Sequence, residues 1–182
     1  MVFERVGNRG SRVFVGDLRT GAERQVGELE GGQLPACTPD GEFVIYGGPD
    51  LMRLPVGGGE PVTLAKGGAH IAVVSPDGSL VAFHAPSPQG ETLSVASAVD
   101  GSGARVVADI APRHFRWLPS GRALVAIISE RGVDNLWELP LDGSPRRQLT
   151  SFTEDVIFRF DIGPDGRYVM SRGRTLRDLV LM

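Results

Sequence analysis

The chain has 182 residues, 41% of them hydrophobic and 23% charged, with a net charge of −3. This composition is typical of a globular protein with no basic face, which argues against nucleic acid as a partner. Its one cysteine, Cys37, excludes an internal disulfide framework and a cysteine-based metal cluster. No apolar run is long enough to span a membrane and no signal-peptide core is present, so neither a membrane segment nor export is expected, and the compartment stays unknown.

The first predicted elements are strands joined by a turn of nine residues. The strand "RVFVGDL" leads into the turn "LRTGAERQV" at 18–26, which has an apolar residue at each end. Turns of the same length and pattern recur at 56–64, 99–107 and 141–149. A strand precedes each of them, so this turn marks a repeated hairpin.

A second kind of turn alternates with the first. It reads "TPDGEFVIY" at 38–46 and returns at 75–83, 118–127 and 163–170, with its glycines spaced by 37, 43 and 45 residues. Proline presets φ at the second turn position and glycine takes a positive φ at the fourth, which closes a type I turn with a bulge. These glycines are therefore predicted to serve backbone geometry and not to bind phosphate.

The two series of turns share one period of about forty residues, which is typical of β-propeller blades. We predict a single all-β domain over 1–182, a β-propeller whose complete blades have four antiparallel strands. It has about 4–5 blades and eighteen strands: a partial blade at about 1–30, complete blades at 31–66, 67–108 and 109–151, and a partial blade at 152–182. No segment keeps the apolar period of a helix over three turns.

The ends of this predicted propeller leave two arrangements open. A six-bladed ring of this period needs about 250 residues, so we expect an open arc that is part of a larger six-bladed propeller. The alternative is a small closed ring of five incomplete blades. Because an arc leaves apolar blade faces and edges uncovered, we expect self-association through them.

The blades resemble TolB-like, WD-type propeller repeats, whose inner corner reads Trp-Ser-Pro-Asp-Gly. "RWLPSG" keeps the tryptophan as Trp117 but replaces the aspartate, whereas Val74, Cys37 and Ile162 stand at the tryptophan position in other blades. The resemblance covers nearly the whole chain. It implies the architecture and says little about function.

The last stretch, 146–182, "RRQLTSFTEDVIFRFDIGPDGRYVMSRGRTLRDLVLM", is similar to the C-terminus of bacterial membrane serine/threonine kinases that carry a TolB-like propeller. The resemblance implies the C-terminal portion of a larger receptor-like protein, extracytoplasmic if it belongs to such a kinase. The chain itself has no glycine-rich loop with its lysine, no His-Arg-Asp loop and no Asp-Phe-Gly, so kinase activity is not expected of it.

The three histidines are the first candidates for a site. His70 and His114 lie at or near the start of an inner strand, close to the predicted mouth of the central channel, where side chains converge. His84 follows "LVAF" and is expected to be a polar residue where its strand ends. No His-x-x-x-His or His-Glu motif accompanies them, and a metal site needs three or four ligands, so no metal ligand is assigned.

Arg116 and Asp161 occupy the same place on the inner strands of adjacent blades, where other blades have Val73 and Ala36. The structural interpretation is an ion pair between blades, because a buried charge must be paired. The functional interpretation is a polar ligand site in the channel, with Arg159 nearby. We favour the structural interpretation.

Aromatic residues on the strands are expected to pack between blades, namely Phe115, Trp117, Trp137, Phe158 and Phe160. Cys37 stands at an apolar position of an inner strand and is interpreted as a small buried residue, not a nucleophile. No Gly-x-Ser-x-Gly nucleophile motif occurs, and Gly57–Gly59 are a hairpin turn with no Walker lysine after them.

These observations predict a non-catalytic binding or sensor module with no catalytic residue and no cofactor, whose protein or small-molecule ligand the sequence does not identify. The alternative is the substrate-gating propeller of a prolyl-oligopeptidase-like peptidase, in which the nucleophile lies in a separate domain. A third class, a hydrolase or lyase acting through channel residues, needs a cluster of acids and histidines that the sequence does not assemble.

Overall fold

The computed structural model describes residues 1–7, 10–29 and 35–174. Within these ranges all regular secondary structure is β, in seventeen strands, and no helix occurs. The prediction of an all-β fold is confirmed. The chain divides into two compact units, Met1–Ala111 and Pro112–Met182, and each is described by itself.

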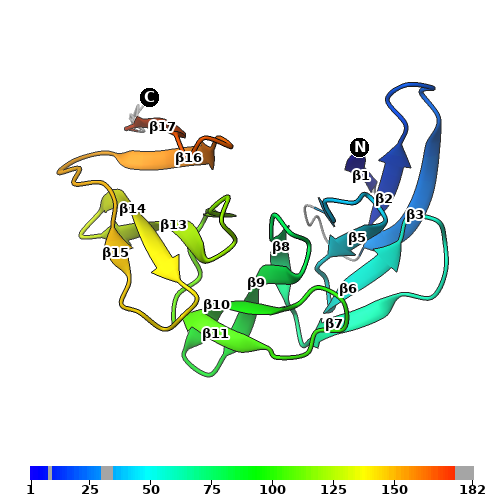
Figure 1. Cartoon of the computed structure of the whole chain (residues 1–182), viewed down its shortest axis with the longest axis horizontal. Helices are drawn as coiled ribbons and strands as arrows, with labels where there is room; N and C mark the ends of the chain where they lie inside the picture. The colour runs from blue at the N-terminus through cyan, green and yellow to red at the C-terminus, as the bar shows by residue number, and fades with distance from the viewer. Residues whose placement is uncertain (8–9, 30–34, 175–182) are drawn as a thin grey trace, which may run out of the picture. The chain divides into compact units, whose positions relative to one another are not determined.

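The first unit contains three antiparallel sheets, in which strands that follow one another along the chain also lie side by side (Figure 1). The first sheet consists of β1 (Val2–Gly7), β2 (Gly10–Gly16) and β3 (Glu23–Leu29). The second consists of β4 (Ala36–Cys37), β5 (Phe43–Tyr46), β6 (Asp50–Pro55) and β7 (Val62–Lys66). The third consists of β8 (His70–Val74), β9 (Leu80–Ser87), β10 (Gly90–Ser97) and β11 (Arg105–Ala108).

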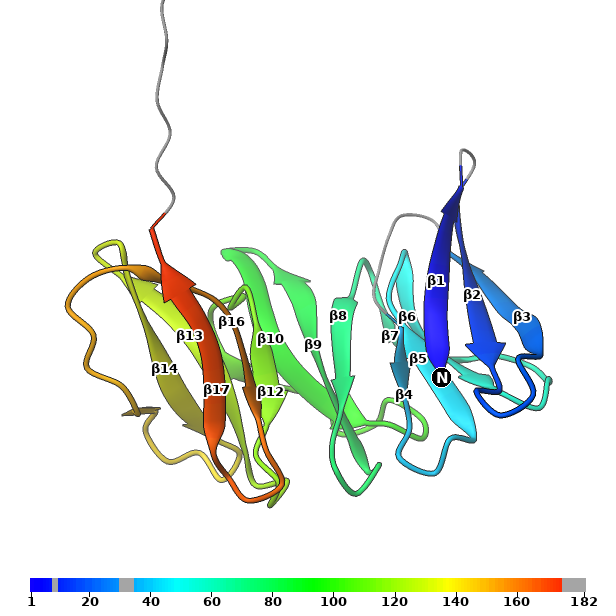
Figure 2. The same cartoon turned by 90° about the horizontal axis from the view of Figure 1, so that it is seen from above.

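The second unit contains a four-stranded sheet and a hairpin (Figure 2). The sheet consists of β12 (Phe115–Trp117), β13 (Ala123–Glu130), β14 (Val133–Pro140) and β15 (Arg147–Gln148). The hairpin consists of β16 (Val156–Ile162) and β17 (Tyr168–Gly173). The last predicted strand, "RDLVLM" at 177–182, lies outside the described residues.

The repeated Pro-Asp-Gly and Pro-Ser-Gly turns are closed by a backbone hydrogen bond. The glycine at the fourth position donates its N–H over 2.9 Å to the carbonyl oxygen three residues earlier. Its φ lies between 68° and 77° in all four turns, at Gly41, Gly78, Gly121 and Gly166, so the positive φ predicted for these residues is confirmed. The hydroxyl of Ser75 and the N–H of Ser79 donate to Asp77, and these bonds hold the pKa of the Asp77 carboxyl below its ordinary value.

Within each unit, neighbouring sheets share their apolar cores. One cluster of buried side chains joins Ile45 of β5 to Phe83 of β9, and another joins Val13 of β2 to Val44 of β5. In the second unit, Phe160 packs the hairpin against the four-stranded sheet. Successive sheets of four sequential antiparallel strands that cover one another's faces are typical of propeller blades. That all blades form one domain, and how the ring closes, stay predictions.

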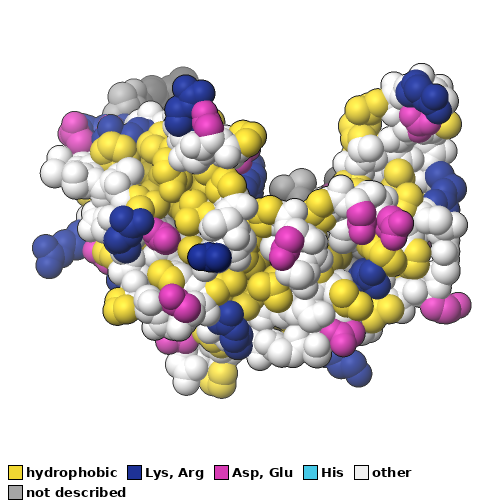
Figure 3. Space-filling view, in the orientation of Figure 1, with side chains coloured by type: hydrophobic (Ala, Val, Ile, Leu, Met, Phe, Trp, Pro, Cys, Tyr) yellow, Lys and Arg dark blue, Asp and Glu magenta, His cyan; other side chains and the backbone are white. Residues whose placement is uncertain are grey.

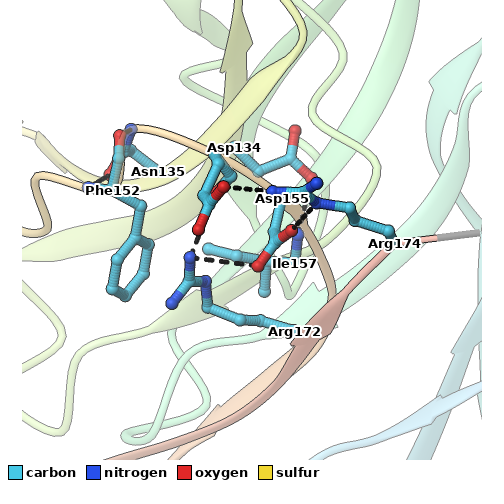
Figure 4. A network of polar contacts seen from close by, with 8 residues as sticks. Asp134, Asn135, Phe152, Asp155, Ile157, Arg172 and Arg174 are labelled. Carbon is cyan, nitrogen blue, oxygen red and sulfur yellow. Dashed lines mark hydrogen bonds and ion pairs between the residues drawn. The ribbon is translucent and has the colours of Figure 1, made fainter.

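Asp134 carries a buried negative charge between the sheet and the hairpin of the second unit. Its side chain is 1% exposed and forms an ion pair with Arg113. The backbone N–H of Ile157 donates to its Oδ2 over 2.8 Å, and Arg113 donates to the carbonyl oxygen of Ile157 over 3.1 Å. This carboxylate therefore ties β14 to β16 (Figure 4), and its charge is matched as burial requires.

Asn135 and Arg172 hold the connection between β15 and β16 in place (Figure 4). The buried Oδ1 of Asn135 accepts hydrogen bonds from the Thr150 hydroxyl and the Phe152 N–H, both over 2.8 Å. Its Nδ2 donates to the Phe152 carbonyl oxygen over 3.2 Å. Arg172 of β17 pairs with Asp155 at 3.4 Å and lies over the Phe152 ring. The backbone N–H and carbonyl oxygen of Phe152 in this connection are thus satisfied by the side chain of Asn135 on the strand beside it.

Gly47 gives the first prediction, because the third sheet passes directly over it. A Cβ atom there would lie 2.6 Å from Cα of His70 and 2.7 Å from the carbonyl oxygen of Ala69, so the two sheets would have to separate. We expect Gly47→Ala to lower the free energy of unfolding by about 2–3 kcal/mol, measured by urea denaturation. Gly48→Ala is the matched control, since the atom nearest to a Cβ there would be the Asp50 carbonyl oxygen at 3.9 Å. Equal losses in the two variants would contradict this close approach.

Asp134 gives the second prediction. Asp134→Ala leaves the Ile157 N–H without its acceptor and separates β14 from β16, so we expect a loss of about 2–4 kcal/mol in the free energy of unfolding. Thermal and urea unfolding would measure it. Glu130→Ala removes an acid whose side chain is 54% exposed and pairs with Arg146, and it should cost less than about 1 kcal/mol. A loss for Asp134→Ala no larger than this control would show that the buried carboxylate does not hold the blades together.

Candidate functional site

A hollow of about 360 Å³ lies between β12 and the β16–β17 hairpin of the second unit. Its polar lining comes from His114, Arg116, Arg159, Asp161 and Ser171. Its apolar lining comes from Phe160, Val169 and Met170. The structure thus brings together the three charged residues that the sequence singled out, along with one of the three histidines.

Strand alternation explains why Arg116 faces this hollow. Side chains of a strand point alternately to its two sides. In β12, Phe115 and Trp117 are buried, at 1% and 6% exposure, so the residue between them is turned the opposite way. A charged residue between two buried aromatic residues is therefore directed out of the core.

Arg116 and Asp161 form the predicted ion pair between adjacent blades. Nε of Arg116 lies 3.6 Å from Oδ1 of Asp161, and the two side chains are 35% and 66% exposed. The structure confirms the pairing that the structural interpretation predicted, but not the burial of the two charges. Because the pair is exposed to water, it contributes little to stability, and the functional interpretation stays open alongside it.

His114 is buried at the inner end of the hollow and is 8% exposed. Its Nε2 lies 2.7 Å from the carbonyl oxygen of Phe160, and since a carbonyl oxygen only accepts, Nε2 carries the proton. Its ring meets the Phe160 ring edge to face at 5.0 Å. Burial, with smaller contributions from Arg116 and Arg159, lowers the pKa of His114, so this ring is neutral at pH 7.

With His114 neutral, two guanidinium groups and one carboxylate give this hollow a net positive charge. Arg159 is exposed. A guanidinium presents donors in a planar fork that fits carboxylate and phosphate oxygens. Met170, Phe160 and Val169 give the same hollow an apolar wall. The chemistry that this arrangement supports is binding of an anionic group attached to an apolar body.

The other two histidines lie together in the first unit, with an acid that the sequence analysis did not consider. His70 and His84 are cross-strand partners on β8 and β9, and their rings meet edge to face at 5.4 Å. Nε2 of His70 lies 3.4 Å from Oε1 of Glu91 on β10. His84 is 3% exposed within β9, which continues to Ser87, so the prediction that the strand ends at His84 is wrong.

Two predictions of burial are also wrong. Cys37 is exposed, whereas Thr38, the residue directly after β4, is buried, so the two neighbouring side chains point to opposite sides of the extended chain. Incomplete hydration still raises the pKa of its thiol, which disfavours the thiolate. Phe158 is 44% exposed. It is the extra residue of a bulge between Ile157 and Arg159, and a bulge turns its side chain out of the alternation.

The other aromatic residues keep more of the predicted pattern. Phe115, Trp117 and Phe160 are buried. Trp137 is partly buried, with the Arg146 guanidinium 4.6 Å from its ring. Hydrophobic side chains that stay open to the surface gather over the part of the second unit around β13–β17 (Figure 3).

Comparison with solved structures identifies the fold as a TolB-like β-propeller. The structure of TolB from Acinetobacter baumannii matches with a TM-score of 0.75 at 16% identity, covering 93% of this chain and 45% of that one. A putative TolB from Agrobacterium tumefaciens matches with a TM-score of 0.69 at 24% identity, covering 88% and 61%. An oligogalacturonate lyase in complex with manganese matches with a TM-score of 0.68 at 19% identity, covering 91% and 54%.

These similarities show the architecture alone, because one fold hosts unrelated functions. The function has to be argued from the residues of the site. The chain spans about half the length of each of these three structures. No protein-family description matches the chain, and no curated protein sequence does. Among the residues that the structure describes, no helix is long and apolar enough to cross a membrane.

Arg116 gives the third prediction. If its ion pair with Asp161 is as weak as its exposure indicates, Arg116→Ala should lower the free energy of unfolding by less than about 1 kcal/mol. Urea denaturation measures this, with Asp134→Ala as the variant that should lose far more. A loss above about 2 kcal/mol would mean that Arg116 is part of the scaffold and would weaken its assignment to a ligand site.

Proposed function

We propose that this chain is a non-catalytic binding module and that the hollow beside β12 receives an anionic group of its ligand. The observation that carries the proposal is the pair of guanidinium groups, Arg116 and Arg159, lining one hollow with Phe160 and Met170. Arginine pairs well with carboxylate and phosphate, and an apolar wall adds affinity for the rest of the ligand. Rigid strands hold both kinds of group in place, as a binding site requires.

The state of His114 supports binding in preference to acid–base catalysis. Its Nε2 proton is donated to the Phe160 carbonyl oxygen, so this nitrogen does not serve as a base. Burial keeps the ring neutral at pH 7 by lowering its pKa. His114 then sets the shape of the inner end of the hollow without adding to its positive charge.

Asp161 gives the hollow selectivity among anions. It already pairs with Arg116 at 3.6 Å, so a bound anion must share or displace this carboxylate. An exposed pair is exchanged at small cost in free energy. A singly charged group such as a carboxylate suits this arrangement better than a multiply charged one, which Asp161 would repel.

The proposal includes the parent protein, which we infer to be a larger receptor-like protein such as a propeller-bearing serine/threonine kinase. Support comes from the similarity of 146–182 to the propeller ends of bacterial membrane kinases. The substrate-gating propeller of a prolyl-oligopeptidase-like peptidase is the alternative. The adjoining coding sequence separates the two: a kinase domain and a membrane helix upstream support the first, and a hydrolase domain downstream supports the second.

N-acetylleucine is a direct probe of the hollow, because it joins one carboxylate to one apolar side chain. We expect it to shift the backbone amide signals of 114–117 and 159–171 in a nuclear magnetic resonance titration. Arg159→Gln removes one charge-assisted contact and should weaken binding by about tenfold or more. Arg147→Gln is the matched control, since Arg147 pairs with Glu138 and does not line the hollow.

N-acetylleucinamide has the same apolar body without the charge and should shift these signals far less. Equal shifts with the amide, or unchanged affinity in Arg159→Gln, would contradict an anion site. Binding that is lost in both Arg159→Gln and Arg147→Gln would point to nonspecific attraction by surface charge.

A further inference from the structure

Three side chains able to bind a metal ion lie together on the third sheet of the first unit. They are His70 of β8, His84 of β9 and Glu91 of β10, and one ligand atom from each lies within 4.8 Å of the other two. The register accounts for this: His84 pairs with His70 on one side and with Leu93 on the other. Glu91 precedes Leu93 by two residues, so both project from the same face.

A hydrogen bond fixes the His70 ring in the form that binds metal. Nδ1 lies 3.0 Å from the carbonyl oxygen of Gly68, and because that oxygen only accepts, Nδ1 carries the proton. In the neutral ring Nε2 then offers its lone pair, and this is the atom that lies 3.4 Å from Oε1 of Glu91. Histidines that bind metals are oriented in this way, with the second ring N–H held by a carbonyl or a carboxylate.

The separation of His70 and Glu91 fits two ligands of one ion better than a hydrogen bond. A charge-assisted N–H···O bond is about 2.7–2.9 Å long. Around a tetrahedral Zn²⁺ ion with bonds of about 2.0–2.1 Å, two ligand atoms are about 3.3 Å apart. Nε2 and Oε1 are 3.4 Å apart. The His84 nitrogen lies within 4.8 Å of both, so an inward movement of at most about 1.5 Å completes the set around an ion.

The backbone beside His70 is distorted in a way that sets the direction of its side chain. The ladder between β8 and β9 shifts register between His70 and Val73, and Ile71 has a φ of 50°. Left-handed backbone is costly for a β-branched residue. Such strain persists where a functional arrangement depends on it. Together with Gly47, which lies against the His70 backbone, the bulge fixes the place of the first ligand.

Exposure increases across the three ligands and leaves a path for an ion. His84 is 3% exposed, whereas the side chains of His70 and Glu91 are 22% and 46% exposed. The inner ligand is therefore held by the sheet, and the outer two meet solvent. An ion bound here has protein on one side and at least one position open to water or to a ligand group.

We propose that His70, His84 and Glu91 bind a divalent transition-metal ion. Two imidazoles and one carboxylate suit Zn²⁺ and its neighbours Co²⁺ and Ni²⁺, whereas Ca²⁺ and Mg²⁺ prefer oxygen ligands alone. Three protein ligands leave the fourth position of a tetrahedral ion to water. The site lies in a different unit from the hollow beside β12, so an experiment that contradicts one of the two sites does not contradict the other.

Titration with Co²⁺ tests the site, using protein purified without a histidine tag. We expect one Co²⁺ per chain with visible absorption of low-symmetry coordination, and its displacement by Zn²⁺. Zn²⁺ at a hundredfold excess over its dissociation constant should raise the melting temperature by roughly 5–10 °C. Glu91→Gln should weaken Co²⁺ binding by about tenfold or more. The matched control, Glu60→Gln, changes an exposed acid in a turn and should leave binding unchanged.

His84 is buried, so its replacement can unfold the protein; the decisive variants are Glu91→Gln and His70→Gln at partly exposed positions. Circular dichroism confirms that each is folded before titration. Absence of Co²⁺ binding to the unmodified chain at millimolar concentration would overturn the proposal. Equal affinity in the unmodified chain, His70→Gln and Glu91→Gln would overturn it as well, because the ion would then lie elsewhere.

Discussion

The described part of the chain has no helix, so its sheets cover one another's apolar faces. In β9 and β10, runs of four and five consecutive residues are buried, so the central strands of the third sheet are covered on both faces. Phe83 joins the cluster that contains Ile45 of the second sheet. A single blade removed from its neighbour would expose these side chains to water, at roughly 1.5–3 kcal/mol for each large one. The repeat therefore gains its stability from stacking.

Stacking at this distance restricts which residues can stand between sheets. Gly47 is needed because the backbone of His70 passes where a Cβ atom would lie. Asp134 is tolerated because Arg113 and the Ile157 N–H match its charge. Both residues join adjacent sheets, one through the absence of a side chain and the other through a paired charge. A polar residue between blades must be paired or turned toward solvent, and Arg116 combines the two, since it pairs with Asp161 and is partly exposed.

The architecture could be predicted from the sequence because it follows from the residues and the spacing of the turns. Each Pro-Asp-Gly turn combines a fixed φ with a glycine of positive φ, and both are local properties that one sequence displays. The contacts could not be predicted in the same way. Phe158 is exposed because of a bulge that no residue type predicts. Cys37 is exposed in a strand of two residues, which is too short for its alternation to be deduced from the sequence.

The two candidate sites differ in how much of each could be predicted from the sequence. Arg116 and Asp161 were found because aligning the repeats places them on corresponding positions of adjacent blades, and the structure pairs them. His70, His84 and Glu91 have no such relation. They belong to three strands of one blade, and only the strand register places them on one face. A search for ligands at short spacing along the chain misses a set whose spacing runs across the sheet.

The polar residues that interrupt apolar strands are the signal that both sites share. Arg116 stands between Phe115 and Trp117, and His84 follows directly after Phe83 in a buried strand. Placing such residues among buried side chains lowers stability unless polar partners compensate. For Arg116 these partners are Asp161 and solvent. His84 lies within 4.8 Å of a second imidazole and a carboxylate, and these three groups together suit a divalent transition-metal ion.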